Sequence, residues 1–332
     1  MDILESIIPD EVILPVAYPL VTSYPVIANM LSITAYYEET IPWFCNHFTQ
    51  IYAHPEGKTI SNFTDDYFDI CPFLNINKIE RNLLPNWIDL LTFITHNIAR
   101  GYYFHLTLDQ YYIPVSNNYK KNHNSHSTFI YGYNNINEEF YIADFYKNFK
   151  YSYEKISFLD FQQAYSDYNY NCYKKYIILL KYEKVRYEFD LERVKNAIED
   201  YVSCMDRTNR FYTRFSAYTK DNIYGLDYYT YAIKCIENLL LDIRPFYVIM
   251  DHKKAMLEKI KYMGEYNYLN NANYLYEKYK EIEQAASVNK QLILKFRFNN
   301  NKELLDNAIK RYRTMAENEE KLLYVMLKNI KS

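Results

Sequence analysis

The spacing of hydrophobic residues changes once along this chain, and that change limits the folds open to it. Before about residue 187, apolar residues alternate with period two in short runs, whereas beyond Tyr187 they recur at helical spacing. Nine of the ten prolines lie at or before Pro114, so turns concentrate in the first part. The sequence therefore predicts an α+β protein with two domains. Residues 1–186 would form a domain around an antiparallel sheet, and residues 187–332 an all-α bundle of about five helices.

Composition favours a globular protein and excludes several classes. Hydrophobic residues make up 49% of the chain and charged residues 24%, and the net charge of −3 gives no reason to expect nucleic acid. No apolar run approaches the ~20 residues of a membrane span. The five cysteines are scattered without a Cys-x-x-Cys pair, so neither a zinc site nor a disulfide framework is implied. With no basic secretory signal at the N-terminus, we expect a cytoplasmic protein without metal or cofactor.

Two short runs that read as strands carry the candidate chemistry. The first runs from His126 to Tyr133, the second from Phe140 to Asp144, and a polar turn joins them. In an antiparallel hairpin His126 and Asp144 lie near the same end. An imidazole oriented by a carboxylate is the base half of a nucleophilic triad. The plainer interpretation is that His126 caps a strand and Asp144 closes a turn.

A candidate nucleophile lies much earlier, at Ser23. The serine suits an N-cap, Pro25 suits a first turn, and Ile27, Met30 and Leu31 form an apolar helical stripe. A helix start offers unpaired N–H groups and the positive end of a dipole, which stabilise developing negative charge. The alternative is that Ser23 only caps a core helix.

The remaining elements follow from the same patterns. We expect a helix over residues 85–100 with Pro85 at its first position, strands over 102–109 and 173–181, and a short helix capped by Ser157. Residues 34–80 read as irregular and aromatic. Helices are expected near 191–205, 228–241, 246–263 and 266–287 and at the C-terminus, with His252 as a core histidine. A metal site at His123 and His126 is discounted, because a strand start cannot space two ligands as a helix would.

The order of these features resembles the papain-like fold, in which a nucleophile at a helix start meets a histidine and an acid on a later sheet. The His-x-x-x-x-x-Gly-Tyr run from His126, with Asp144 after it, looks like the bacteriocin-processing peptidases of that superfamily. It is closer still to the N-terminal domain of the butirosin biosynthesis acyltransferase family. Asp109 and Pro114 also suit that family, and the similarity covers about residues 12–185.

The resemblance implies an activity. Members of the family pass acyl groups from phosphopantetheine thioesters on acyl carrier proteins to an amine, and one relative forms amide bonds in closthioamide assembly, which suggests natural-product biosynthesis. By position, Ser23 would be the nucleophile, His126 the general base and Asp144 the residue that orients it. Backbone N–H groups of Ser23 and Tyr24 would form the oxyanion hole. Tyr24, Tyr103 and Tyr131 would line the acyl pocket.

The departure from the family lies at the nucleophile. The family has cysteine where this chain has Ser23, and the usual upstream glutamine is missing from Val16–Thr22. Three alternatives stay open: serine is the working nucleophile, it is an engineered replacement of cysteine, or the site has lost its chemistry and keeps only its pocket. A peptidase or amidase on the same scaffold and a non-catalytic binding or scaffold protein are the competing functions. The sequence leaves a homodimer open.

Overall fold

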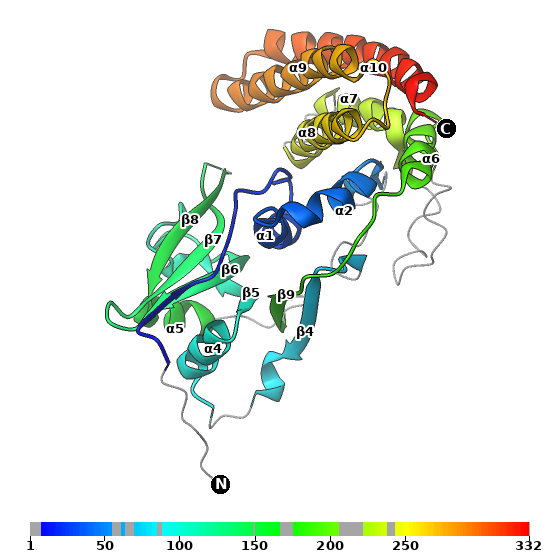
Figure 1. The fold of residues 1–332 in the computed structure, drawn as a ribbon. Helices are drawn as coiled ribbons and strands as arrows, with labels where there is room; N and C mark the ends of the chain where they lie inside the picture. Colours follow the sequence, from blue (N-terminus) through cyan, green and yellow to red (C-terminus); the bar gives the residue numbers. More distant parts are fainter. Residues whose placement is uncertain are drawn as a thin grey trace. The chain divides into compact units, whose positions relative to one another are not determined.

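The computed structural model describes residues 8–54, 61–63, 70–84, 88–148, 150–166, 175–205, 222–237 and 243–331. These residues form an α+β fold with an antiparallel sheet and C-terminal helices, as the sequence predicts (Figure 1). The chain divides into two compact units. The first comprises Met1–Glu38 and Cys71–Arg186, and the second comprises Glu39–Ile70 and Tyr187–Ser332.

The division corrects one part of the expected organisation. The two units part after Arg186, where the sequence places the boundary, but residues 39–70 belong to the second unit rather than the first. Their polar groups are satisfied there: Asn46 Oδ1 accepts a hydrogen bond from the backbone N–H of Asp190 at 3.0 Å, and His252 Nε2 lies 2.7 Å from the carbonyl of Thr49. His252 is thus the buried, satisfied histidine that the sequence predicts.

The first unit is built on a seven-stranded sheet in which every described pairing is antiparallel. The order is β4 (Leu74–Glu80), β9 (Tyr176–Tyr182), β5 (Tyr102–Asp109), β6 (Ser125–Asn134), β7 (Glu139–Lys147) and β8 (Lys150–Ser157), with β1 (Glu11–Ile13) also pairing with β6. Strand β5 has the predicted bounds, and β6 and β7 form the predicted hairpin. Strands β1, β4 and β8 are additions to the prediction, and the first two residues of the expected 173–181 strand lie outside the described residues.

Helices cover both faces of this sheet. Helices α4 (Leu90–Ala99) and α5 (Phe158–Ser166) pack on the face that carries the main hydrophobic core, and α1 (Pro25–Thr34) lies on the other (Figure 1). Ser157 caps α5 as expected, since its Oγ accepts from the N–H of Asp160 at 3.0 Å. Helix α4 starts later than expected because Asp89 caps it, accepting from Thr92 N; residues 85–87 lie outside the described residues.

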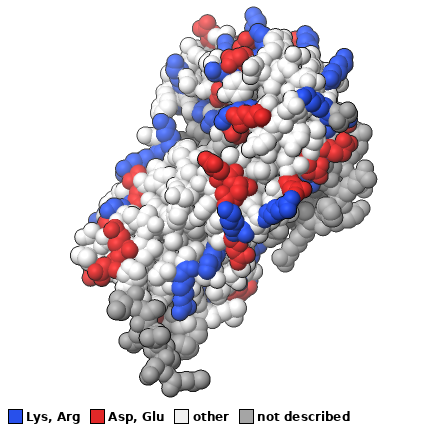
Figure 2. Space-filling model, in the orientation of Figure 1, with Lys and Arg blue, Asp and Glu red and all other residues white. Residues whose placement is uncertain are grey.

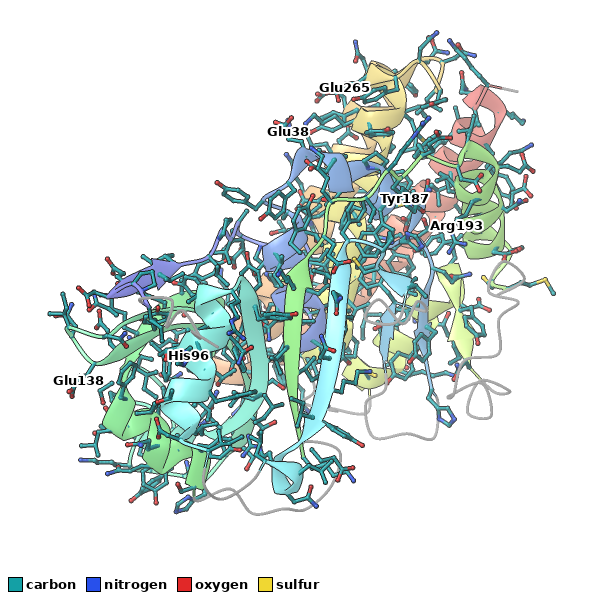
Figure 3. The ribbon with its side chains drawn as sticks, turned by 60° about the horizontal axis from the view of Figure 1, so that its bottom comes forward. Glu38, His96, Glu138, Tyr187, Arg193 and Glu265 are labelled. Carbon is teal, nitrogen blue, oxygen red and sulfur yellow. The ribbon has the colours of Figure 1, made fainter. Side chains whose placement is uncertain are left out.

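Gly132 lies at an irregularity in β6, where the pairing with β7 shifts between Ile130 and Gly132. Strand β1 passes directly against this point. A Cβ at position 132 would lie 2.5 Å from the carbonyl oxygen of Val12 and 2.9 Å from the Tyr141 ring. The glycine in the His-x-x-x-x-x-Gly-Tyr run is therefore a requirement of backbone approach. The hairpin continues to the turn at Glu138, which is labelled at the left of Figure 3.

The second unit consists of helices with a three-stranded sheet. The described elements of this unit are α2 (Ile41–Asn46), β2 (Ile51–Ala53), β3 (Ser61–Phe63), α6 (Leu191–Val202), β10 (Ile223–Tyr224), α7 (Tyr228–Glu237), α8 (Arg244–Glu265), α9 (Ala272–Asn299) and α10 (Lys302–Asn329). Residues 34–80, which were expected to be irregular, thus contain α2, β2, β3 and, in the first unit, β4. Short 3-10 turns occupy Glu38–Thr40, Arg81–Leu83, Gln110–Tyr112 and Gly225–Asp227.

A fully buried ion pair lies among these helices. Lys253 Nζ on α8 lies 2.7 Å from both carboxylate oxygens of Glu319 on α10, and neither side chain is exposed. Glu319 also accepts from the hydroxyls of Tyr229, at 2.6 Å, and Tyr279. Burial lowers the pKa of Lys253 to about 8, against the opposing effect of Glu319. The pair persists because the two charges compensate each other, hydroxyl donors also serve the carboxylate, and the Tyr201 hydroxyl accepts from the ammonium at 3.0 Å.

Acidic and basic side chains are interspersed over the face drawn in Figure 2. Among the residues that the structure describes, no helix combines the length and the apolar character that crossing a membrane requires.

Replacing Gly132 by alanine tests the close approach of β1. Because the new Cβ would meet a backbone carbonyl, we expect Gly132→Ala to lower the free energy of unfolding by about 1–3 kcal/mol, measured by urea denaturation. Ser127→Ala, on the same strand, adds no atom and serves as the control. Equal unfolding free energies of the two variants would show that the backbone of β1 does not approach position 132 closely enough to exclude a Cβ.

Removing one partner of the buried ion pair tests how far the charges of Lys253 and Glu319 stabilise each other. Lys253→Met leaves a buried carboxylate without its cation, so we expect a loss of about 3–5 kcal/mol in unfolding free energy. Lys253→Met combined with Glu319→Gln removes both charges and keeps an acceptor for the tyrosine hydroxyls, so it should recover most of the loss. A double variant as unstable as the single one would contradict this account.

Candidate functional site

The candidate site lies at one end of the sheet of the first unit. Strand β5 ends at Asp109, β6 begins at Ser125, and β7 nears its end at Asp144. Because neighbouring strands are antiparallel, the end of β5, the start of β6 and the end of β7 meet here. The two residues singled out in the hairpin are therefore brought to one place by strand direction alone.

His126 and Asp144 are in direct contact. His126 Nδ1 lies 2.5 Å from Asp144 Oδ2; the carboxylate side chain is wholly buried, while the imidazole is 30% exposed. The contact expected from the hairpin is thus present, and it directs Nδ1 of the ring at the carboxylate. The other ring nitrogen, Nε2, lies outside this contact.

Gln110 contacts the same carboxylate oxygen as His126. Its Nε2 donates to Asp144 Oδ2 at 3.2 Å, while its Oε1 accepts from Asn118 Nδ2 at 2.7 Å and Asn124 Nδ2 at 2.9 Å. With the oxygen engaged by two amide donors, the amide nitrogen must face Asp144. No sequence pattern points to Gln110, since a single glutamine after a strand is not distinctive.

A second histidine–carboxylate pair occupies the same end of the sheet. His123 Nδ1 lies 2.6 Å from Asp109 Oδ2. Asp109 Oδ1 accepts from the backbone N–H groups of Tyr111, at 3.0 Å, and Asn124, at 2.9 Å. These donors outweigh the effect of burial and keep the pKa of Asp109 below its usual value. The sequence suggests a role for His123 only as a metal ligand, which is discounted above. Among the described residues, no group of three or more His, Cys, Asp or Glu side chains could hold a metal ion.

Helix α1 is tied to the sheet through Asn29. Its Oδ1 accepts from the Tyr151 hydroxyl at 2.8 Å, so its Nδ2, 2.7 Å from His105 Nδ1, is the donor there. Burial, and secondarily the nearby His126 imidazole, lowers the pKa of His105 to about 4. His105 is therefore a neutral acceptor at physiological pH, and His126 lies within electrostatic reach of it.

The start of α1 points toward the expected end of the sheet, but Ser23 does not hold the expected helix position. Helix α1 begins at Pro25 with Tyr24 as its N-cap residue, so Ser23 lies one residue before the cap. At the other end of α1, Tyr37 stacks on Tyr182 with ring centroids 3.5 Å apart, at the sheet end opposite to His126. Because Asn29 contacts the middle of β5, the start of α1 points toward the end that holds the two histidine–carboxylate pairs.

The serine and the imidazole are not hydrogen-bonded. Ser23 is 9% exposed, and its Oγ is buried without a hydrogen-bond partner. Strand alternation also separates them: His126 is paired with Leu108, on the face of α4 and α5, whereas α1 contacts His105 on the opposite face. His126 is the second residue of its strand, so Ser23 can approach it only around the end of the sheet.

The three tyrosines assigned to the acyl pocket lie on the α1 side. Tyr103 is buried, donates to the carbonyl of Pro15 at 2.6 Å and stacks on Phe129. Burial raises the pKa of Tyr131 to about 12, and its ring packs edge-on against Tyr153. Both rings belong to an aromatic layer beneath α1 and the N-terminal segment. Tyr24 is half-buried. Their contact with an acyl group stays a prediction.

The comparisons with known proteins leave the family unassigned. No protein-family model matches the chain, and no curated protein matches it.

The buried neutral state of His105 predicts a pH dependence of stability. A histidine in the unfolded chain has a pKa of about 6.5, whereas His105 in the folded protein has a pKa of about 4. Between these two pH values the unfolded state therefore binds a proton at His105 that the folded state does not bind. The unfolding free energy should fall as pH falls through this window, by up to about 3 kcal/mol from this group. Urea denaturation between pH 7.5 and 4.5 should show a shallower fall for His105→Gln. Parallel curves would mean that His105 is protonated in the folded protein.

Proposed function

We propose that the first unit is a papain-like acyltransferase that moves an acyl group from a carrier-protein thioester to an amine. The observation that carries the proposal is the 2.5 Å contact between His126 Nδ1 and the buried Asp144 carboxylate. The order of elements supports it, since a helix start near Ser23 precedes the sheet and points toward the same sheet end. The acyl carrier protein, the small amine, a place in natural-product biosynthesis and a cytoplasmic location are parts of this proposal.

In the first half-reaction Ser23 Oγ attacks the thioester carbonyl. His126 Nε2 takes the hydroxyl proton, the C–O bond forms, and the C–S bond breaks as the thiol leaves with that proton. Asp144 accepts from Nδ1–H and stabilises the imidazolium that forms between these steps. Pro25 has no N–H, so the nearest backbone donors for the oxyanion are those of Ser23 and Tyr24. One well-placed donor of this kind is worth about 2.7–4 kcal/mol.

In the second half-reaction the amine nitrogen attacks the Ser23 ester. His126 moves a proton from the nitrogen to Oγ while the C–N bond forms and the C–O bond breaks. Attack by water instead of an amine would make the same site a peptidase or amidase. Which acceptor reacts is decided by what reaches the ester, since the catalytic groups are the same.

A non-catalytic binding protein is the second candidate. Ser23 Oγ has no hydrogen-bond partner, and α1 and His126 belong to opposite faces of the sheet. On this account the His126–Asp144 contact only closes the end of the sheet, and serine stands where the resembling family has cysteine.

Intact-mass measurements distinguish the two. Protein with Ser, Cys or Ala at position 23 is incubated with octanoyl-N-acetylcysteamine and, in parallel, with an octanoyl-loaded phosphopantetheine carrier protein. We expect one octanoyl group on the Ser and Cys forms, none on Ser23→Ala, and a loss of labelling by at least ~100-fold in rate in His126→Ala.

The other outcomes are equally informative. Labelling of Ser23→Cys alone would indicate that serine replaces a working cysteine. Labelling of all three forms alike would remove residue 23 from the mechanism. No labelling of any form would favour the binding protein.

A further inference from the structure

His123 is held in one orientation without being buried. Its Nδ1 is 2.6 Å from Asp109 Oδ2, and its ring stacks on Tyr111 with centroids 4.2 Å apart and planes 15° from parallel. The imidazole side chain is nevertheless 62% exposed, while that of Asp109 is 4% exposed. A fixed carboxylate, an in-plane hydrogen bond and a stacked ring are the features that orient a catalytic imidazole. Here the oriented ring meets solvent.

The two histidine–carboxylate pairs are built from neighbouring residues but belong to opposite faces. Asp109 holds His123, and the next residue, Gln110, holds Asp144. Asp109 is four residues after His105 on β5, so it shares the face on which α1 packs, whereas Asp144 shares the face of α4 and α5. Asp109, with the His123 that it holds, therefore belongs to the same face of the sheet as α1, whose start carries Ser23.

Transfer to an amine requires two proton movements from one nitrogen. At neutral pH an alkylamine is an ammonium ion, which cannot attack a carbonyl until it loses a proton. The attacking nitrogen then loses a second proton as the amide forms. Only the second proton returns to the leaving Ser23 oxygen; the first must go to solvent. His126 shuttles the second proton, so a separate base in contact with solvent would carry the first away without occupying His126.

We propose that His123 is the base that deprotonates the acceptor ammonium, and that Asp109 is its positioning residue. The inference rests on the proposed acyltransferase function and assigns its acceptor as a primary alkylamine. His123 Nε2 takes one proton from R–NH3+ and releases it to solvent through its exposed edge. The neutral amine then forms the C–N bond, the C–O bond to Ser23 breaks, and His126 carries the second proton to Oγ.

Two acceptors separate this role from a structural one. Ethanolamine is an ammonium ion at neutral pH, whereas hydroxylamine is largely uncharged and needs no such base. His123→Gln and wild-type protein are first labelled at position 23 with octanoyl-N-acetylcysteamine, and loss of the label to each acceptor is then followed by intact mass. We expect His123→Gln to slow transfer to ethanolamine by at least ~100-fold. Transfer to hydroxylamine should stay within a few-fold of wild type.

Controls fix the interpretation. His96→Gln removes a histidine on α4, away from this sheet end, and should transfer to both acceptors like wild type. Asp109→Asn should show the same acceptor-dependent loss as His123→Gln, to a smaller extent. Equal transfer to ethanolamine by His123→Gln and wild type would overturn the assignment of His123 while leaving the acyl-enzyme intact. An equal loss with both acceptors would also overturn it, because a structural role does not distinguish them. Failure of wild-type protein to take up label would instead remove the proposed function, and this inference with it.

Discussion

The first unit depends on the burial of one carboxylate at the end of its sheet. Asp144 is wholly buried, and a carboxylate in that position is stable only when other groups supply hydrogen bonds. His126 supplies one from the neighbouring strand, and Gln110 supplies another from the segment after β5. Asn118 and Asn124 then fix Gln110 in turn. Both hydrogen bonds fall on Oδ2, while Oδ1 is buried without a hydrogen-bond partner among the described residues. The arrangement of this sheet end thus follows from pairing one buried carboxylate oxygen, and the orientation of the His126 ring comes with it.

Local pattern was sufficient where one strand or one hairpin decides the outcome. The alternation of Tyr102–Asp109 gave the bounds of β5, and the hairpin brought His126 to Asp144 because antiparallel strands allow no other arrangement of those ends. The local pattern was insufficient where contacts with residues distant in the sequence decide which unit a segment joins. Asn46 and Thr49 read as part of the first domain until the partners of their polar atoms, Asp190 and His252, are known.

Helix starts and polar contacts were the weakest part of the prediction. Ser23 and Pro85 have the right chemistry for a helix start, but Tyr24 and Asp89 hold the N-cap positions of α1 and α4. Strands β4 and β8 are absent from the prediction, because the residues between their apolar positions include asparagine, lysine and glutamate, which are depleted in strands. The Asp109–His123 pair carries no sequence signature, since it joins the end of one strand to the loop before the next. The sequence therefore indicates one histidine at this site where the structure orients two.

The path of the chain between the two units has a consequence for biosynthesis. Residues 39–70 leave the first unit after α1 and pack with residues 187–332, and the chain then returns to complete the sheet. On the ribosome, Trp43, Phe48 and Ile51, all fully buried in the finished protein, emerge long before the helices that cover them. The first unit can close its sheet once β9 has been made, with this aromatic segment still exposed as a long insertion. A nascent chain halted near residue 186 would therefore expose the apolar side chains of residues 39–70. We expect a chaperone to bind to this segment.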